Sequence, residues 1–121
     1  MNIIQYVEDD FCYLSTTGRR SGNMHTIEIW FALQDTTLYL LAGGREKADW
    51  VRNIMQQPEI QVKLGEQLYR GEAHVVEAAS EEDALARRLV ETKYTPRSSD
   101  DLTEWARDSL PIAIVIRNRI Q

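Results

Sequence analysis

Alternation between apolar and polar residues predicts β-strands in the first third of the chain. Phe11–Thr17 is rich in aromatic and β-branched residues and stops at a glycine, as strands commonly do. Met24–Gln34 alternates over its whole length, which is typical of one long strand with a buried face. A short turn at residues 35–36 leads to a returning strand at Thr37–Leu41. The pattern therefore predicts a long hairpin between these last two strands.

A helical period follows at residues 46–57, with an apolar stripe made by Trp50, Val51, Ile54 and Met55. Pro58 ends this helix because proline interrupts the helical hydrogen bonds. The remaining pattern predicts a hairpin of two strands, two helices and a buried final strand, at residues 60–64, 67–76, 80–92, 100–109 and 112–116. Ser80 followed by Asp83 predicts the N-terminal cap of the first of these helices.

This order of elements predicts an α+β fold: a six-stranded, mostly antiparallel split β-barrel with flanking helices. A chain of 121 residues fits a single domain, residues 1–121, and is long enough to bury a stable core without disulfides. Its 43% hydrophobic and 27% charged residues are typical of a globular protein.

The single cysteine, Cys12, excludes an internal disulfide and gives no sign of an oxidising compartment. Residues 1–6 lack the basic and apolar regions of a signal peptide. The longest apolar run near the C-terminus, Ile112–Ile116, is too short to cross a bilayer. We therefore expect a cytoplasmic protein without a transmembrane segment, and peripheral membrane contact stays open.

A net charge of −5 argues against nucleic-acid binding. The charge is unevenly distributed, because the stretch from Arg19 to Arg52 holds five basic and four acidic residues. The rest of the chain is strongly acidic. A local basic patch of this kind suits a small anionic ligand, and a solvated surface is the alternative.

Two glycine-containing loops are candidates for holding such an anion. The first, Gly18–Gly22, places Arg19, Arg20 and Ser21 between two glycines, which supplies donors suited to phosphate. The second runs from Ala42 through Gly43 and Gly44 to Lys47, where free N–H groups at a helix start attract anions. The alternative for the first loop is an exposed hairpin loop without a ligand. The alternative for the second is a strand-to-helix connection that requires glycine only for its backbone conformation.

Other chemistries find little support in the sequence. The two histidines, His25 and His74, together with Cys12 lack the spacing of metal ligands, so no metal site is predicted. No nucleophile-elbow pattern suggests hydrolysis by a serine triad. Trp30 and Trp50 are close to the two loops in the sequence. Each could pack against the flat ring system of a ligand, and packing in the hydrophobic core is the alternative.

Several motifs, in their order and spacing, resemble the deazaflavin-dependent nitroreductase family of the flavin-binding split-barrel group, which includes pyridoxamine phosphate oxidase. The similar segments are Thr16–Gly22, Trp30-Phe31, Ala42–Gly44, Ala48–Asn53, Ile60–Leu64, Tyr94, Trp105 and Leu110–Val115. The resemblance covers nearly the whole chain.

The resemblance implies a split barrel, often dimeric, that binds the 5-deazaflavin coenzyme F420. Carried over by position, the cofactor contacts are Arg19, Arg20, Ser21, His25, Trp30, Ala42, Gly43, Gly44, Lys47 and Trp50. Tyr94 is the candidate catalytic proton donor, and water is the alternative. His25 and Glu28 depart from the family pattern, as does the small number of tyrosines near Tyr94, which leaves the cofactor and the acceptor open.

We therefore expect an oxidoreductase that transfers a hydride from reduced deazaflavin to an electron-poor acceptor. A quinone, a nitro compound and an activated alkene are the acceptor classes implied by the resemblance. The cofactor carries the reactive chemistry, and the protein binds and orients. The expected partners are this small-molecule acceptor and a second copy of the chain in a homodimer. An FMN- or haem-binding protein of the same fold and a non-catalytic cofactor carrier remain alternatives.

Overall fold

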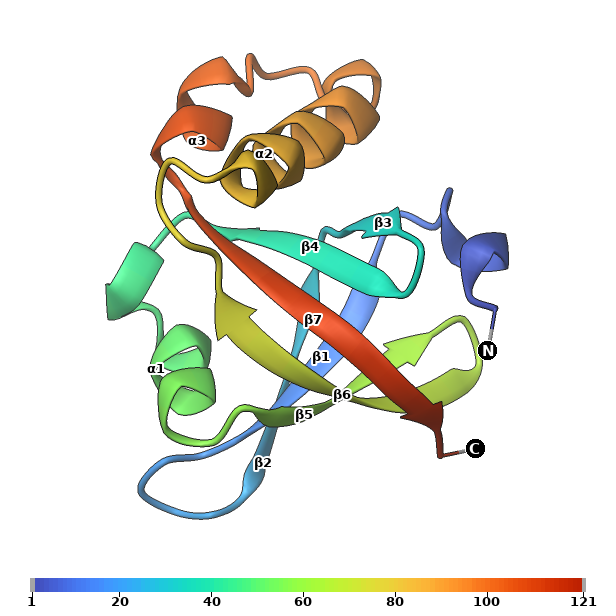
Figure 1. Ribbon diagram of the computed structural model, residues 1–121, viewed down its shortest axis with the longest axis vertical. Helices are drawn as coiled ribbons and strands as arrows, with labels where there is room; N and C mark the ends of the chain where they lie inside the picture. The colour runs from blue at the N-terminus through green and yellow to red at the C-terminus, as the bar shows by residue number, and fades with distance from the viewer. Residues whose placement is uncertain (1, 121) are drawn as a thin grey trace.

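Seven β-strands form one curled sheet in the computed structural model, which describes residues 2–120 (Figure 1). The strands follow the order β2-β1-β5-β6-β7-β4-β3 across the sheet, and each neighbouring pair is antiparallel. Their bounds are β1 Cys12–Thr17, β2 Met24–Ile29, β3 Ala32–Gln34, β4 Thr37–Ala42, β5 Glu59–Leu64, β6 Gln67–Val75 and β7 Leu110–Arg119.

Helices flank this sheet on two sides, so the predicted α+β class is confirmed (Figure 1). α2 and α3 lie together over β4, whereas α1 lies apart from them and contacts β1 and β6. The helices are α1 Asp49–Gln56, α2 Glu81–Tyr94 and α3 Thr103–Asp108, with 3₁₀ turns at η1 Ile4–Tyr6, η2 Arg45–Lys47 and η3 Thr95–Arg97. Across residues 2–120, every helix is too short or too polar to span a membrane.

β4 and β7 are buried on both faces because the core has two parts. Along β4, Leu38 and Leu40 face a cluster enclosed by the curled sheet, whereas Tyr39 and Leu41 face a cluster beneath α2 and α3. β7 repeats this arrangement, since its isoleucines join the first cluster and Ala113 joins the second. Two-sided burial explains why both strands are continuous apolar runs in the sequence.

The expectation of six strands and of a long strand at Met24–Gln34 was wrong. The chain leaves the ladder at Trp30 and Phe31, which divides this segment into β2 and β3. β2 pairs with β1, from Cys12 opposite Ile29 to Thr17 opposite Met24. Of the two strands made from this segment, only the short β3 pairs with β4, so the predicted long hairpin is reduced to three residue pairs.

Two side chains at the end of α2 stabilise this break. The Tyr94 hydroxyl accepts a hydrogen bond from the Phe31 N–H at 3.0 Å and lies within donating distance of the Phe31 and Asp10 carbonyls. Lys93 Nζ donates to the carbonyls of Phe31 and Asp9 at 2.9 and 2.6 Å. Phe31 therefore finds side-chain partners in place of a neighbouring strand.

Other boundaries also differ from the predicted ones. The helix expected from residue 46 begins as η2, passes through an extended Ala48 and becomes α1 at Asp49. Met55 was predicted to be buried as part of the apolar stripe of this helix, but it is 61% exposed. Asn53 is buried instead. The final strand, expected at residues 112–116, extends over Leu110–Arg119 and includes Pro111, whose carbonyl accepts from the Val76 N–H.

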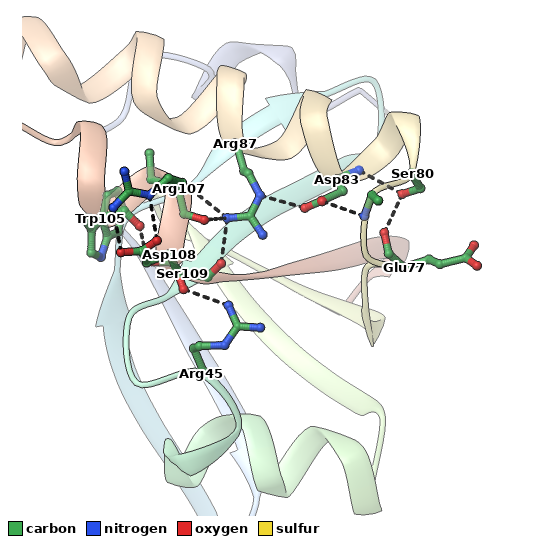
Figure 2. Close-up of polar contacts among 11 residues, drawn as sticks. Arg45, Glu77, Ser80, Asp83, Arg87, Trp105, Arg107, Asp108 and Ser109 are labelled. Atoms are coloured by element: carbon green, nitrogen blue, oxygen red, sulfur yellow. Dashed lines mark hydrogen bonds and ion pairs between the residues drawn. The ribbon is translucent and has the colours of Figure 1, made fainter.

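Polar contacts cap α2, hold α2 and α3 together and join α3 to η2 (Figure 2). Ser80 caps α2, since its hydroxyl accepts from the Asp83 N–H at 3.1 Å, as predicted. Arg87 binds Asp83 and lies 2.8 Å from each of three carbonyls at the end of α3, those of Ala106, Arg107 and Ser109. Arg45 donates to a fourth carbonyl, that of Asp108, and so connects η2 to α3 (Figure 2).

We predict that Tyr94→Phe lowers the free energy of unfolding by about 1–3 kcal/mol, because it leaves the buried N–H of Phe31 without a partner. Tyr13→Phe is the matched control, since Tyr13 is 43% exposed, and a change within about 0.5 kcal/mol is expected there. Denaturant unfolding of both variants measures the difference. Equal stabilities for the two variants would contradict the role given to the Tyr94 hydroxyl.

We also predict a pH effect from Lys93. Burial, and secondarily repulsion from Arg97, lowers the pKa of Lys93 from 10.5 to about 8, against the attraction of nearby carboxylates at residues 8–10. Between about pH 8 and 10.5 the unfolded chain therefore binds more protons at this site, so its contribution to stability rises with pH. Neutral Lys93 still has two N–H donors for its two carbonyl partners.

Lys93→Met removes this titrating amine, whereas the buried Cys12 thiol, whose pKa burial raises from 9.0 to about 12, lowers stability above about pH 9 in both proteins. The stability of wild type relative to Lys93→Met is expected to increase as the pH rises from 8 to 10.5. Unfolding curves at several pH values test this, and a constant difference would refute it.

Candidate functional site

A cavity of about 620 Å³ opens between the β1–β2 loop, β2 and the first half of α1. Figure 1 shows this loop at the end of the β1–β2 hairpin, below α1. The lining residues combine basic, hydroxyl and apolar side chains: Thr16, Gly18, Arg19, Arg20, Ser21, Met24, His25, Thr26, Ile27, Asp49, Trp50 and Asn53.

The loop closes on itself through its own backbone. The Gly18 N–H donates to the Asn23 carbonyl at 2.7 Å, and the Gly22 N–H donates to the Gly18 carbonyl at 2.9 Å. Gly22 has a φ of +75°, which favours glycine. A Cβ on Gly18 would lie 2.7 Å from both Ser21 Oγ and His25 Nε2, so only glycine lets these two side chains lie against the turn.

Asn53 anchors this loop to α1. Its side chain is buried, and its Nδ2 donates to Thr16 Oγ1 at 3.1 Å. Its Oδ1 accepts from the backbone N–H of Arg19 at 3.2 Å and from Arg19 Nη1 at 2.9 Å. One amide therefore joins the end of β1, the loop and the helix.

The two arginines of the loop have different surroundings. Arg19 contacts Asp49 as well as Asn53, through an ion pair of 3.2 Å to the Asp49 carboxylate. Arg20 is exposed, and within residues 2–120 it forms neither an ion pair nor a side-chain hydrogen bond. The positive charge that the cavity leaves available to a ligand therefore belongs to Arg20.

Half of the predicted cofactor contacts line this cavity, and half do not. Those that line it are Arg19, Arg20, Ser21, His25 and Trp50. Those outside its lining are Trp30, Ala42, Gly43, Gly44 and Lys47. Glu28, which looked unfavourable for an anionic ligand, is an exposed β2 residue opposite Tyr13 and is also outside the lining.

Trp30 and Gly43 both lie against Trp105, outside the cavity lining. The Trp30 ring stacks on Tyr94 with a centroid distance of 4.2 Å and meets Trp105 edge-on at 5.7 Å. Gly43 lies against Trp105 at a separate, acidic depression near Asp108. Because η2 separates Gly44 from α1, the glycine pair does not open directly into the helix N-terminus as the sequence suggested.

Tyr94, the candidate proton donor, is 1% exposed. Its hydroxyl is bound to the backbone at Phe31 and Asp10, and burial raises its pKa to about 12. Tyr94 is not among the residues that line the 620 Å³ cavity.

Sequence reasoning missed Thr16, Asp49 and Asn53 as site residues. The signal for Asn53 was present, because a polar residue three positions after Trp50 interrupts the buried face of a helix. The described part of the chain contains no cluster of His, Cys, Asp or Glu residues that could hold a metal ion.

The curled, mostly antiparallel sheet with flanking helices defines a class of small α+β proteins, and the basic loop lies at a cavity of this fold. Within that class, the chain belongs to the F420H(2)-dependent quinone reductase family, whose sequence model matches residues 3–116. The resemblance to deazaflavin-dependent reductases found in the sequence is thereby confirmed.

Solved structures share this fold at low sequence identity. An F420-H2 dependent reductase is 19% identical, with a TM-score of 0.71 over 90% of this chain and 95% of that one. A domain-swapped dimer is 21% identical, with a TM-score of 0.70 over 90% and 81%. The heme storage protein HutZ from Vibrio cholerae is 14% identical, with a TM-score of 0.69 over 95% and 87%. No curated protein matches the chain by sequence.

Proposed function

We propose that this protein is an oxidoreductase that binds the deazaflavin coenzyme F420 in the 620 Å³ cavity and reduces an electron-poor small molecule. The observation that carries the proposal is the Gly18–Gly22 loop, which presents the uncommitted charge of Arg20 at a cavity in a member of an F420H(2)-dependent family. Quinones are the first acceptor class to test, followed by nitro compounds and activated alkenes.

The donors at the cavity fit the phosphate of such a coenzyme. Arg20 supplies a charged fork, and Ser21 supplies a hydroxyl beside it. Within the described residues the backbone N–H groups of Arg20 and Ser21 make no intramolecular hydrogen bond, so they remain free to donate to an anion. Half-buried Trp50 provides an aromatic wall for a flat ring.

The bound coenzyme supplies the hydride, and the chain's residues hold and orient the reactants. His25 lies 3.5 Å from Ser21 Oγ and completes the polar edge of the cavity. Lys47, exposed two residues before α1, is proposed to meet the acidic tail of the coenzyme. We assign no proton transfer to Tyr94, because its hydroxyl is committed to the backbone, and the proton comes from water.

A first prediction concerns cofactor and turnover. The purified protein is expected to bind oxidised F420, seen as a change in the deazaflavin fluorescence, and to oxidise reduced F420 in the presence of menadione. Binding without turnover would favour the carrier alternative. A visible spectrum with flavin or haem bands, together with no response to F420, would refute the proposal in favour of the other cofactors.

A second prediction concerns Arg20. Arg20→Ala is expected to weaken F420 binding by about ten- to a hundredfold, since hydrogen bonds to charged groups contribute roughly 1.5–3 kcal/mol. Arg20→Lys is expected to recover only part of the affinity, because it keeps the charge and loses the planar fork. The matched control is Arg70→Ala, which removes an exposed arginine outside the cavity lining. Equal F420 affinities for Arg20→Ala and Arg70→Ala would show that the loop is a surface hairpin without a role in binding.

We further propose a homodimer. Exposed large apolar side chains remain on the described surface: Ile4, Phe11, Tyr13, Met24, Met55 and Val75. One protein of the same fold is a domain-swapped dimer, which supports this proposal. Light scattering is expected to give twice the chain mass of 14.0 kDa at micromolar concentrations. A monomer mass throughout that range would refute it.

A further inference from the structure

The amide of Asn53 makes three hydrogen bonds with two residues that flank and begin the cavity loop. Thr16 accepts from Nδ2, and Arg19 donates to Oδ1 from both its backbone and its guanidinium. Because Asn53 is only 4% exposed, water cannot readily replace these partners, and loss of one leaves a buried polar group unpaired. The loop therefore has one defined attachment to α1.

Arg19 is committed to the same attachment. Its guanidinium spans Asn53 Oδ1 and the Asp49 carboxylate, with a further contact of 3.4 Å to the Asp49 carbonyl. The side chain is 20% exposed, so it lies along α1 and away from bulk solvent. Asp49 balances its charge locally. An anion at the loop would therefore have to compete with Asp49 for Arg19, whereas Arg20 has no such competitor among residues 2–120.

We propose that Asn53 and Arg19 are positioning residues that hold the Gly18–Gly22 loop in its binding shape, so that Arg20 makes the charged contact with the phosphate of the coenzyme. This inference rests on the proposed function and revises the contact role that the sequence gave to Arg19. Asn53 and Trp50 are three residues apart on α1 and share a face, so the attachment also sets the spacing between the loop and the aromatic wall. Preorganisation of this kind raises affinity by removing the entropic cost of ordering the loop on binding.

The test is titration of F420 fluorescence at several salt concentrations. Arg20→Ala is expected to weaken binding and to flatten the dependence of log Kd on log salt, because it removes the charged contact. Asn53→Ala is expected to weaken binding about tenfold and to leave the salt dependence unchanged. Arg19→Lys is expected to behave like Asn53→Ala, because lysine keeps the charge and cannot span Asn53 and Asp49.

Two further variants test the positioning role: a conservative variant that should retain affinity, and a double variant whose effects should not add. Asn53→Asp keeps acceptors for Arg19 and for the Thr16 hydroxyl, so its affinity is expected to stay within about threefold of wild type. The Arg19→Lys/Asn53→Ala double variant is expected to bind no more than about twofold weaker than either single variant, since both changes release one attachment. If Asn53→Ala does not fold, Thr16→Val loosens the same amide more mildly, and a smaller loss of affinity without a change in salt dependence is expected.

Amide hydrogen exchange of Arg19 gives a readout without ligand. This N–H donates to Asn53 Oδ1, so its exchange is expected to be slow in wild type and Asn53→Asp and fast in Asn53→Ala. Fast exchange in Asn53→Ala with unchanged F420 affinity would overturn the positioning role. A flattened salt dependence in Arg19→Lys would overturn the division of roles between the arginines. If wild type binds no F420 while the exchange pattern holds, the proposed function fails and the attachment itself stands.

Discussion

The Tyr94 hydroxyl and the Lys93 amine hold Phe31 at the point where β2 ends and β3 begins. If its N–H and carbonyl had no partners, this buried residue would carry unsatisfied backbone groups. Continued strand pairing would then be more stable than the break. The break separates β2 from β3, so β2 pairs with β1 while β3 remains with β4. The β1–β2 hairpin carries the cavity loop, and the site therefore depends on contacts made by α2 on the other side of the sheet.

Buried polar side chains also hold the backbone in place at the cavity loop. Asn53 uses its amide to hold the loop, and Arg19 satisfies both that amide and Asp49. Among the described residues, each fully buried side-chain nitrogen or oxygen has a hydrogen-bond partner. Interior polar groups in this protein thus fix backbone segments in place, and the exposed Arg20 remains free for a ligand.

Low sequence identity to the structural neighbours is compatible with a shared fold because the sheet requires only suitable patterns. β4 and β7 need apolar residues on both faces, and many combinations of aliphatic side chains meet that need. The loop is more demanding, since a Cβ on Gly18 would force the side chains of Ser21 and His25 to move. The resemblance found in the sequence accordingly depended on several segments in their order and spacing, with this loop as one of them.

The sequence by itself determined the α+β class, most element positions, the cap at Ser80 and the family, because these follow from local periodicity, turn residues and a motif read in order. Only the tertiary structure decided the strand break at Phe31 and the separation of Gly43 from the cavity, since Tyr94 acts on Phe31 across 63 residues. It likewise decided the difference between Arg19 and Arg20, which are adjacent basic residues in the sequence. Their roles diverge because Asn53 and Asp49 on α1 reach only one of them in space.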